Sequence, residues 1–354
     1  MKYRNSKIVI VSFMILLFLN ISFASGPYRV GTTTAGFLEM GYGNAGNGMG
    51  EAHVSMARGL ESVYWNPAGL GYMQKNEFSL FYQPWVADID FSMGGLAYVQ
   101  PGVGTFAISF INASFGAEDV TTVANPDGTG ETFTGQDLAM QFSFGRKLAQ
   151  WFSFGATGKY VSSRIWRSSA SAFATDLGVI VNTNFFNWTD QPGDGLNIGM
   201  SISNFGSRMQ MAGKNIKDVL DISEDENGNY QYLPVNYETE EWELPLIFRI
   251  GISFNALQTE NQKITCSIDA LHPNNNSESI NLGAQYALTI PAVGEFFLRT
   301  GYKGLLMENS PYGLSFGGGL KLKLMKNYGV GLEYSLRDFG DLGYLHSYST
   351  SILF

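Results

Sequence analysis

The sequence predicts an all-β protein: a transmembrane, antiparallel β-barrel of about fourteen strands with a short, partly helical N-terminal plug. Three observations predict this class. Charged residues make up 15% of the 354 residues, against roughly 25% in a typical soluble domain. From residue 77 onward, apolar and polar residues alternate in segments long enough for a tilted strand to cross a bilayer. After the first 24 residues, no apolar run approaches the ~20 residues of a transmembrane helix.

The first 24 residues have the pattern of a secretory signal peptide. A basic region is followed by an apolar stretch over residues 8–21, and small residues precede an expected cleavage before Ser25. The basic residues are Lys2, Arg4 and Lys7, and the small residues are Ser22 and Ala24. We therefore expect export and exclude residues 1–24 from the fold.

Residues 25–76 form the expected plug. The segment is rich in glycine over residues 41–50, and apolar residues then recur at about one helical turn, at Ala52, Met56, Leu60 and Val63 or Tyr64. It ends in a turn signal, the plug turn, made of Asn66, Pro67, Ala68 and Gly69. A segment this long and this apolar fits inside the barrel or under its mouth. The plug turn is either a plain turn or a gating element.

Fourteen strands are expected in residues 77–354. With an even number of strands, the last strand ends on the side of the membrane where the first strand begins. The alternation is cleanest over 328–338. The expected strands are 77–87, 90–100, 103–115, 135–148, 151–166, 169–183, 195–205, 245–257, 260–271, 278–288, 292–304, 312–324, 328–338 and 344–354.

Charged residues within these strands keep to the face opposite the apolar one. They are Lys159, Asp176, Arg249, Asp269, Lys321, Lys323, Glu333 and Arg337. A Lys or Arg that faces lipid at mid-depth costs roughly 2–4 kcal/mol. We therefore expect these side chains to line the lumen.

The connections predict which end of the barrel faces outward. The longest are 116–134, 184–194 and 206–244, which we expect outside the cell, whereas short turns are typical of the periplasmic side. The short turns are Pro101–Gly102, 149–150, 273–277 and 326–327.

The loop 206–244 is acidic and carries four aromatic residues: Tyr230, Tyr232, Tyr237 and Trp242. Its carboxylates lack the spacing of an EF-hand loop, so a solvated lid or face is the main interpretation. The aromatic residues make it the candidate protein-contact surface.

A candidate lateral opening lies in the first two strands. Pro84, Gly94 and Gly95 would interrupt the pairing of these strands. The alternative is a bulge that helps to curve the sheet.

The last strand stops on an aromatic residue. Ser347, Ser349 and Ser351 form its small polar face, and Phe354 ends the chain. Such terminal strands resemble the signal recognised by the assembly machinery of the bacterial outer membrane. Outer-membrane lipid and this machinery are the expected partners, and the net charge of −9 argues against nucleic acid.

Two blocks resemble the N-terminal signature of the PorV/PorQ family: residues 46–54 (GNGMGEAHV) and 64–70 (YWNPAGL). Further landmarks lie at 85–89, 269–273 and 279–284. This family is related to FadL-like outer-membrane transporters. The resemblance implies a fourteen-stranded barrel in the outer membrane, plugged by an N-terminal segment with an Asn-Pro-Ala turn.

Three functions follow as alternatives. By resemblance, the first is a secretion-associated barrel of type IX kind that holds or passes secreted cargo proteins. The second is a FadL-like conduit for hydrophobic small molecules, and the third is a passive structural barrel or adhesin. We expect no enzyme, no metal and no cofactor, because the three histidines, His53, His272 and His346, belong to no catalytic or metal-binding motif.

Overall fold

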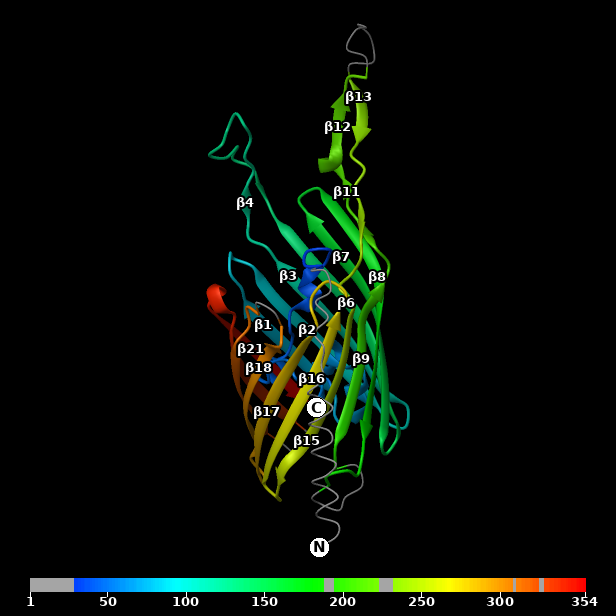
Figure 1. Ribbon diagram of the computed structural model, residues 1–354, viewed down its shortest axis with the longest axis vertical. Coiled ribbons are helices and arrows are strands. Elements are labelled where there is room, and N and C mark those ends of the chain that lie inside the picture. Colours follow the sequence, from blue (N-terminus) through cyan, green and yellow to red (C-terminus); the bar gives the residue numbers. More distant parts are fainter. Residues whose placement is uncertain (1–28, 188–193, 223–231, 308–309, 325–327) are drawn as a thin grey trace.

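The computed structural model describes residues 29–187, 194–222, 232–307, 310–324 and 328–354. Fourteen of the strands in these residues form a closed antiparallel barrel (Figure 1), in which β21 pairs back to β1. In chain order they are β1 (Glu77–Pro84), β2 (Asp90–Gln100), β3 (Gly104–Ser114), β6 (Gly135–Ala149), β7 (Phe152–Ile165), β8 (Ser168–Asn182), β9 (Asn197–Gly206), β15 (Ile247–Gln258), β16 (Gln262–Pro273), β17 (Ser279–Ile290), β18 (Gly294–Leu305), β19 (Leu314–Lys323), β20 (Gly329–Asp338) and β21 (Tyr344–Leu353).

The predicted fold class is confirmed, and each strand ends within three residues of its predicted bounds. Alternation places the large apolar side chains outside. In β8, Ala172 and Ala174 are buried in the lumen, while Phe173 and Leu177 are exposed on the outer surface. An outer face of exposed apolar side chains is typical of a barrel surrounded by lipid.

Strand direction, rather than loop length, decides the end at which each connection lies. The β3–β6 and β9–β15 connections share one end, the long-loop end, beyond which the β12–β13 hairpin projects (Figure 1). The prediction for 184–194 was wrong: this connection follows β8 and lies at the opposite end. The prediction for 273–277 was also wrong, because a connection between β16 and β17 must lie at the long-loop end.

The connections contain short elements of their own. These are β4 (Glu118–Asp119), β5 (Thr132–Phe133), β10 (Met209–Gln210), β11 (Ala212–Gly213), η3 (Lys214–Ile216), β12 (Lys217–Leu220), β13 (Leu233–Asn236), β14 (Glu241–Trp242) and η4 (Gly340–Leu342).

Residues 29–76, the described part of the plug, lie largely inside the barrel (Figure 1). They form η1 (Gly36–Glu39), α2 (Asn44–Gly48), α3 (Ser62–Trp65) and η2 (Pro67–Tyr72). The helical spacing predicted from Ala52 was wrong as far as Leu60, because this stretch folds as turns, whereas Val63 and Tyr64 at its end lie in α3. Gly59, inside this stretch, has a φ of +75°, which a right-handed helix cannot contain. Among the described residues, none of the helices is long and apolar enough to cross a bilayer.

Candidate functional site

Glycines in the wall let the plug press directly against the inside of the barrel. A Cβ on Gly155 of β7 would overlap the carbonyl group of Pro67, and one on Gly301 of β18 would overlap the backbone of Met49. Similar contacts around the wall define the glycine belt: Gly145, Gly155, Gly178, Gly199, Gly283, Gly301 and Gly317. At each of these positions the plug leaves no room for a side chain, and it therefore fills the lumen at this level.

A buried carboxylate joins the plug to β18 and β20. Glu51 Oε1 accepts hydrogen bonds from Lys303 Nζ and Arg337 Nη1, each at 2.8 Å. Arg337 also donates to Gln83 of β1. Burial by itself would raise the pKa of Glu51, but Lys303 and Arg337 together outweigh it, so this pKa lies below its ordinary value of 4.5. We call Glu51, Lys303 and Arg337 the latch.

Further hydrogen bonds extend the attachment along the same half of the wall. Asp269 Oδ2 of β16 accepts from the backbone N–H of Val54 at 2.7 Å. Ser335 Oγ of β20 donates to Asn44 Oδ1 at 2.9 Å. The half of the lumen formed by β15–β21 is therefore polar and directional in its contacts with the plug.

The predicted plug turn lies where the plug meets β8. Asn66 Nδ2 donates to the carbonyl oxygens of Val54, at 2.9 Å, and Val179 of β8, at 3.0 Å. Its Oδ1 accepts from the N–H of Ala68, and Pro67 begins η2. Asn66 thus connects two parts of the plug to the wall.

The other half of the lumen contacts the plug mainly through apolar side chains, although β7 and β8 also bring the buried Lys159–Asp176 ion pair into it. The wall side chains of β2, β3 and β6–β8 that face the plug there are mostly small: Met93, Ala97, Ala107, Ile111, Ala113, Ala139, Val161, Ala170, Ala172 and Ala174. The plug covers them with buried apolar residues such as Phe37, Leu38 and Val63. This apolar half contrasts with the charged half on β15–β21.

A series of aromatic rings leads from the plug to the long-loop end. We call it the aromatic run: Trp65, Tyr64, Tyr42, Phe91, Trp85, Phe339 and Tyr312. Successive ring centroids are 4.8, 5.2, 6.5, 5.8, 5.0 and 5.1 Å apart, all in edge-to-face geometry. Phe339 immediately precedes η4 in the β20–β21 connection. Apolar and ring contacts are therefore continuous between the plug and the rim.

The charged residues predicted for the lumen are found in several environments. Lys159 and Asp176 form a buried ion pair at 2.6 Å, and Glu333 pairs with Arg299 at 3.0 Å. Arg249 is buried and donates to Ser203 Oγ at 3.0 Å. Asp269 and Arg337 hold the plug, as described above. Lys321 is partly buried beside Leu60 and Glu61 of the plug, whereas Lys323 is exposed at the end of β19.

The candidate lateral opening shows no gap. The β1–β2 and β2–β3 ladders continue through Gly94 and Gly95 without a register shift, and Pro84 forms the last pair of the β1–β2 ladder. The expected interruption of pairing is therefore absent from these strands, because both glycines and the proline are accommodated in regular ladders. A lateral opening here would require these hydrogen bonds to break.

The candidate protein-contact loop stands away from the barrel mouth (Figure 1). Tyr232 and Tyr237 are exposed on the β12–β13 hairpin or beside it, and Tyr237 Oη donates to Asp218 at 2.8 Å. Trp242 lies in β14 and pairs with Met209 of β10. Tyr230 lies outside the described residues.

The three histidines do not converge. His53 contacts Glu61 at 3.2 Å, His272 contacts Glu278 at 2.9 Å, and His346 contacts Tyr334 at 2.8 Å. Within the described part of the chain, no group of three potential metal ligands comes together.

The latch and the aromatic run were not identified in the sequence. Glu51 and the plug aromatics lie in a segment without a regular period, so no face could be assigned to them. The glycines of the belt could have indicated where the plug contacts the wall, because several of them are paired on neighbouring strands. Gly145, Gly155 and Gly178 form one such row.

The fold and the site define a plugged transmembrane β-barrel. No family model and no curated protein matches the sequence. Among solved structures, the Pseudomonas putida toluene transporter TodX is similar, with a TM-score of 0.55 and 12% identity over 88% of this chain and 98% of that one. The CymD monoaromatic hydrocarbon channel has a TM-score of 0.52 and 12% identity over 88% and 96% of the two chains.

The Ralstonia pickettii toluene transporter TbuX has a TM-score of 0.51 and 12% identity over 88% and 97% of the two chains. At this identity, the likeness to all three proteins is one of fold. The chain thus shares its barrel architecture with transporters and channels.

Proposed function

We propose that this protein is an outer-membrane conduit for small apolar compounds, aromatic hydrocarbons in particular. The observations that carry the proposal are the apolar contact between the plug and the apolar half of the wall and the aromatic run, which leads from the plug through Phe91 to Tyr312 at the long-loop end. Small alanine side chains and aromatic rings offer a hydrocarbon apolar and edge-to-face contacts.

The comparisons support the same choice. The similar barrels include toluene transporters and a monoaromatic hydrocarbon channel. Their names describe their own substrates. We extend that substrate class to this chain because apolar side chains line the contact between its plug and its wall.

Passage requires the plug to shift, because the glycine belt leaves no space between plug and wall. We assign this movement to the apolar half. Apolar contacts are non-directional, so contacts with a hydrocarbon can replace contacts between plug and wall. The latch on the opposite half would keep the plug attached while the solute passes.

A second candidate is the secretion-associated role implied by the resemblance to PorV/PorQ proteins. The exposed β12–β13 hairpin favours it, because such a projection offers a surface to a protein partner. We rank it below the conduit, since the plug fills the lumen and the hairpin lies outside it.

Uptake measurements test the proposal. The protein would be expressed in a bacterial host without a hydrocarbon channel, and entry of radiolabelled toluene would be compared with entry of radiolabelled sucrose. We expect toluene entry to rise several-fold and sucrose entry to stay at the level of the empty host. Equal entry of toluene with and without the folded barrel would refute the conduit.

A deletion in the native host separates the second candidate. The conduit predicts unchanged secretion of proteins to the cell surface. Loss of such secretion, together with unchanged toluene uptake, would favour the secretion-associated role instead.

A further inference from the structure

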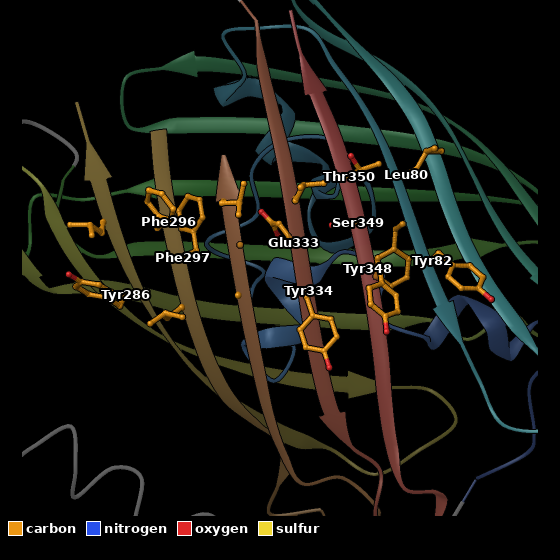
Figure 2. A pocket seen from close by; sticks show the side chains of 17 residues that line it. Leu80, Tyr82, Tyr286, Phe296, Phe297, Glu333, Tyr334, Tyr348, Ser349 and Thr350 are labelled. Carbon is orange, nitrogen blue, oxygen red and sulfur yellow. The ribbon is translucent and has the colours of Figure 1, made fainter. Parts of the chain in front are cut away.

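The outer wall carries an open apolar groove of about 910 Å³ that spans β17, β18, β19, β20, β21 and β1 (Figure 2). This size lies within the range of small-molecule sites. Figure 2 shows Tyr334 and Tyr348 on neighbouring strands at one side of the groove and Tyr286 with Phe296 at the other. The groove faces away from the lumen, because Tyr82, Tyr334 and Tyr348 are exposed on the outer surface.

Strand register explains the groove. One row of directly paired outward residues crosses all six strands: Tyr82, Tyr348, Tyr334, Gly318, Leu298 and Tyr286. Gly318 is the position in this row without a side chain. The next row, toward the end opposite the long loops, extends from Leu80 to Leu288 and is apolar except for Thr350.

Gly318 leaves a gap that is open to the outside. A Cβ built there would meet only the carbonyl oxygen of Phe297, at 3.9 Å. The backbones of β18 and β20 on either side are about 10 Å apart, twice the spacing of neighbouring strands. Between Leu298 and Tyr334 the floor of the groove is therefore bare backbone of β19.

The groove is polar at one end only. Tyr334 Oη shares a hydrogen bond with His346 Nδ1 at 2.8 Å, and Tyr82 Oη donates to Asp90 Oδ1 at 2.6 Å. His346 and Asp90 both lie toward the long-loop end of their strands. Tyrosines with a polar tip and an apolar body are typical of the level where lipid headgroups meet hydrocarbon.

We propose that this groove binds an acyl chain of a membrane lipid, with the headgroup toward His346 and the tail across the bare backbone at Gly318 toward Leu320. The groove is continuous with the outward apolar face on both sides, so lipid is its natural surrounding. Glu333, the charged residue of its lining, points into the lumen toward Arg299. The site is separate from the proposed conduit and does not depend on transport.

Photolabelling tests the site directly. The purified barrel would be reconstituted in phosphatidylcholine vesicles that contain a small fraction of phosphatidylcholine with a diazirine in its acyl chain. Labelled peptides would be mapped by mass spectrometry. We expect labelling to concentrate on β18 and β20 around Leu298 and Tyr334, and Gly318→Leu to reduce it several-fold by filling the gap.

Gly158→Leu is the matched control. Gly158 is an outward glycine of β7 where a Cβ would meet nothing within 4 Å. It lines a separate outer groove on β3 and β6–β9, so a side chain there leaves the groove on β17–β21 and β1 unchanged. Heat-modifiable gel mobility would verify that each variant folds, and Gly318→Ala serves as a smaller filler if Gly318→Leu does not. Labelling spread evenly around the barrel, or unchanged by a folded Gly318 variant, would overturn the proposal.

Two further outcomes would replace the lipid with another occupant. Displacement of the label by toluene would show that the groove holds the solute. Crosslinks between copies of the chain at Tyr334 would show that it holds a second barrel. Both results contradict the acyl-chain site and leave the proposed conduit untouched.

Discussion

Glu51 of the plug and Arg337 of β20 share a hydrogen bond of 2.8 Å, although 286 positions separate them in the sequence. Both side chains are 4% exposed, and Lys303 donates to the same oxygen. Glu51 holds this position with a φ of +65°, a conformation that few residues other than glycine adopt. The surrounding contacts therefore impose an unfavourable backbone geometry to place one carboxylate between two cations.

Replacing Glu51 with glutamine should loosen the plug. Glu51→Gln leaves Arg337 buried without a carboxylate, and the loss of one partner of a buried pair costs about 3–5 kcal/mol. Hydrogen exchange of residues 44–72 measures this effect as faster exchange. Glu243→Gln is the control, because its ion pair with Arg208 is exposed and is worth about 0–1 kcal/mol. Equal exchange in the two variants would contradict the latch.

Acid should release the plug. Because the pKa of Glu51 is lowered in the folded protein, its contribution to stability is present above 4.5 and is lost as the pH falls through the folded pKa. We expect plug protection to be constant from neutral pH down to that region and to fall below it. The same pH series on Glu51→Gln should show a smaller change. An identical fall in both proteins would assign the acid effect to other groups.

Two glycines of β7 test how closely the plug packs against the wall. Gly155 faces the lumen, where a methyl group would overlap Pro67, whereas Gly158 faces outward with nothing within 4 Å. Gly155→Ala should destabilise the plug by about 1–3 kcal/mol through overpacking, and Gly158→Ala should change little. Limited proteolysis of the folded barrels measures the difference. Similar cleavage of the two variants would mean that the plug adjusts without strain.

The barrel was readily predictable because lipid and lumen impose opposite demands on alternate residues. Every strand carries this pattern, so its position could be located to within three residues. The end at which a loop lies depends on strand order, and loop length alone misassigned 184–194 and 273–277. The plug faces protein on most sides and has no period, so the spacing from Ala52 to Leu60 predicted a helix where turns occur.

The candidate site was predictable only in part, for a related reason. Strand charges such as Lys159 and Asp176 could be assigned to a face by alternation, and they meet inside the barrel. The plug residues that contact the wall could not be assigned to a face, because the plug has no regular period. The contact between Tyr42 and Phe91, for example, is seen only in the folded structure. Contacts between a segment without a period and a regular wall require the three-dimensional structure.

Asn66 should tolerate few substitutions. Its amide group donates to the carbonyl oxygens of Val54 and Val179. Asn66→Asp keeps the shape but places a carboxylate oxygen against these acceptors, so both hydrogen bonds are lost and that buried oxygen is left unsatisfied. An unsatisfied buried group costs about 1–3 kcal/mol. We expect a lower unfolding midpoint in denaturant, whereas Asn182→Asp, at the partly buried end of β8, should have a smaller effect. Equal midpoints would mean that the hydrogen bonds of Asn66 do not stabilise the folded barrel.

A polar group in the apolar half should impede hydrocarbon passage. Met93 of β2 is 5% exposed and belongs to the apolar half. Met93→Gln nearly preserves the volume but introduces an amide that a passing hydrocarbon cannot satisfy, which raises the barrier by about 1–3 kcal/mol. Since about 1.4 kcal/mol corresponds to tenfold, toluene uptake should fall by roughly this order. Met93→Leu conserves both volume and polarity and should retain wild-type uptake. If both folded variants take up toluene equally well, the solute does not pass along the apolar half, and the conduit must be sought elsewhere in the barrel.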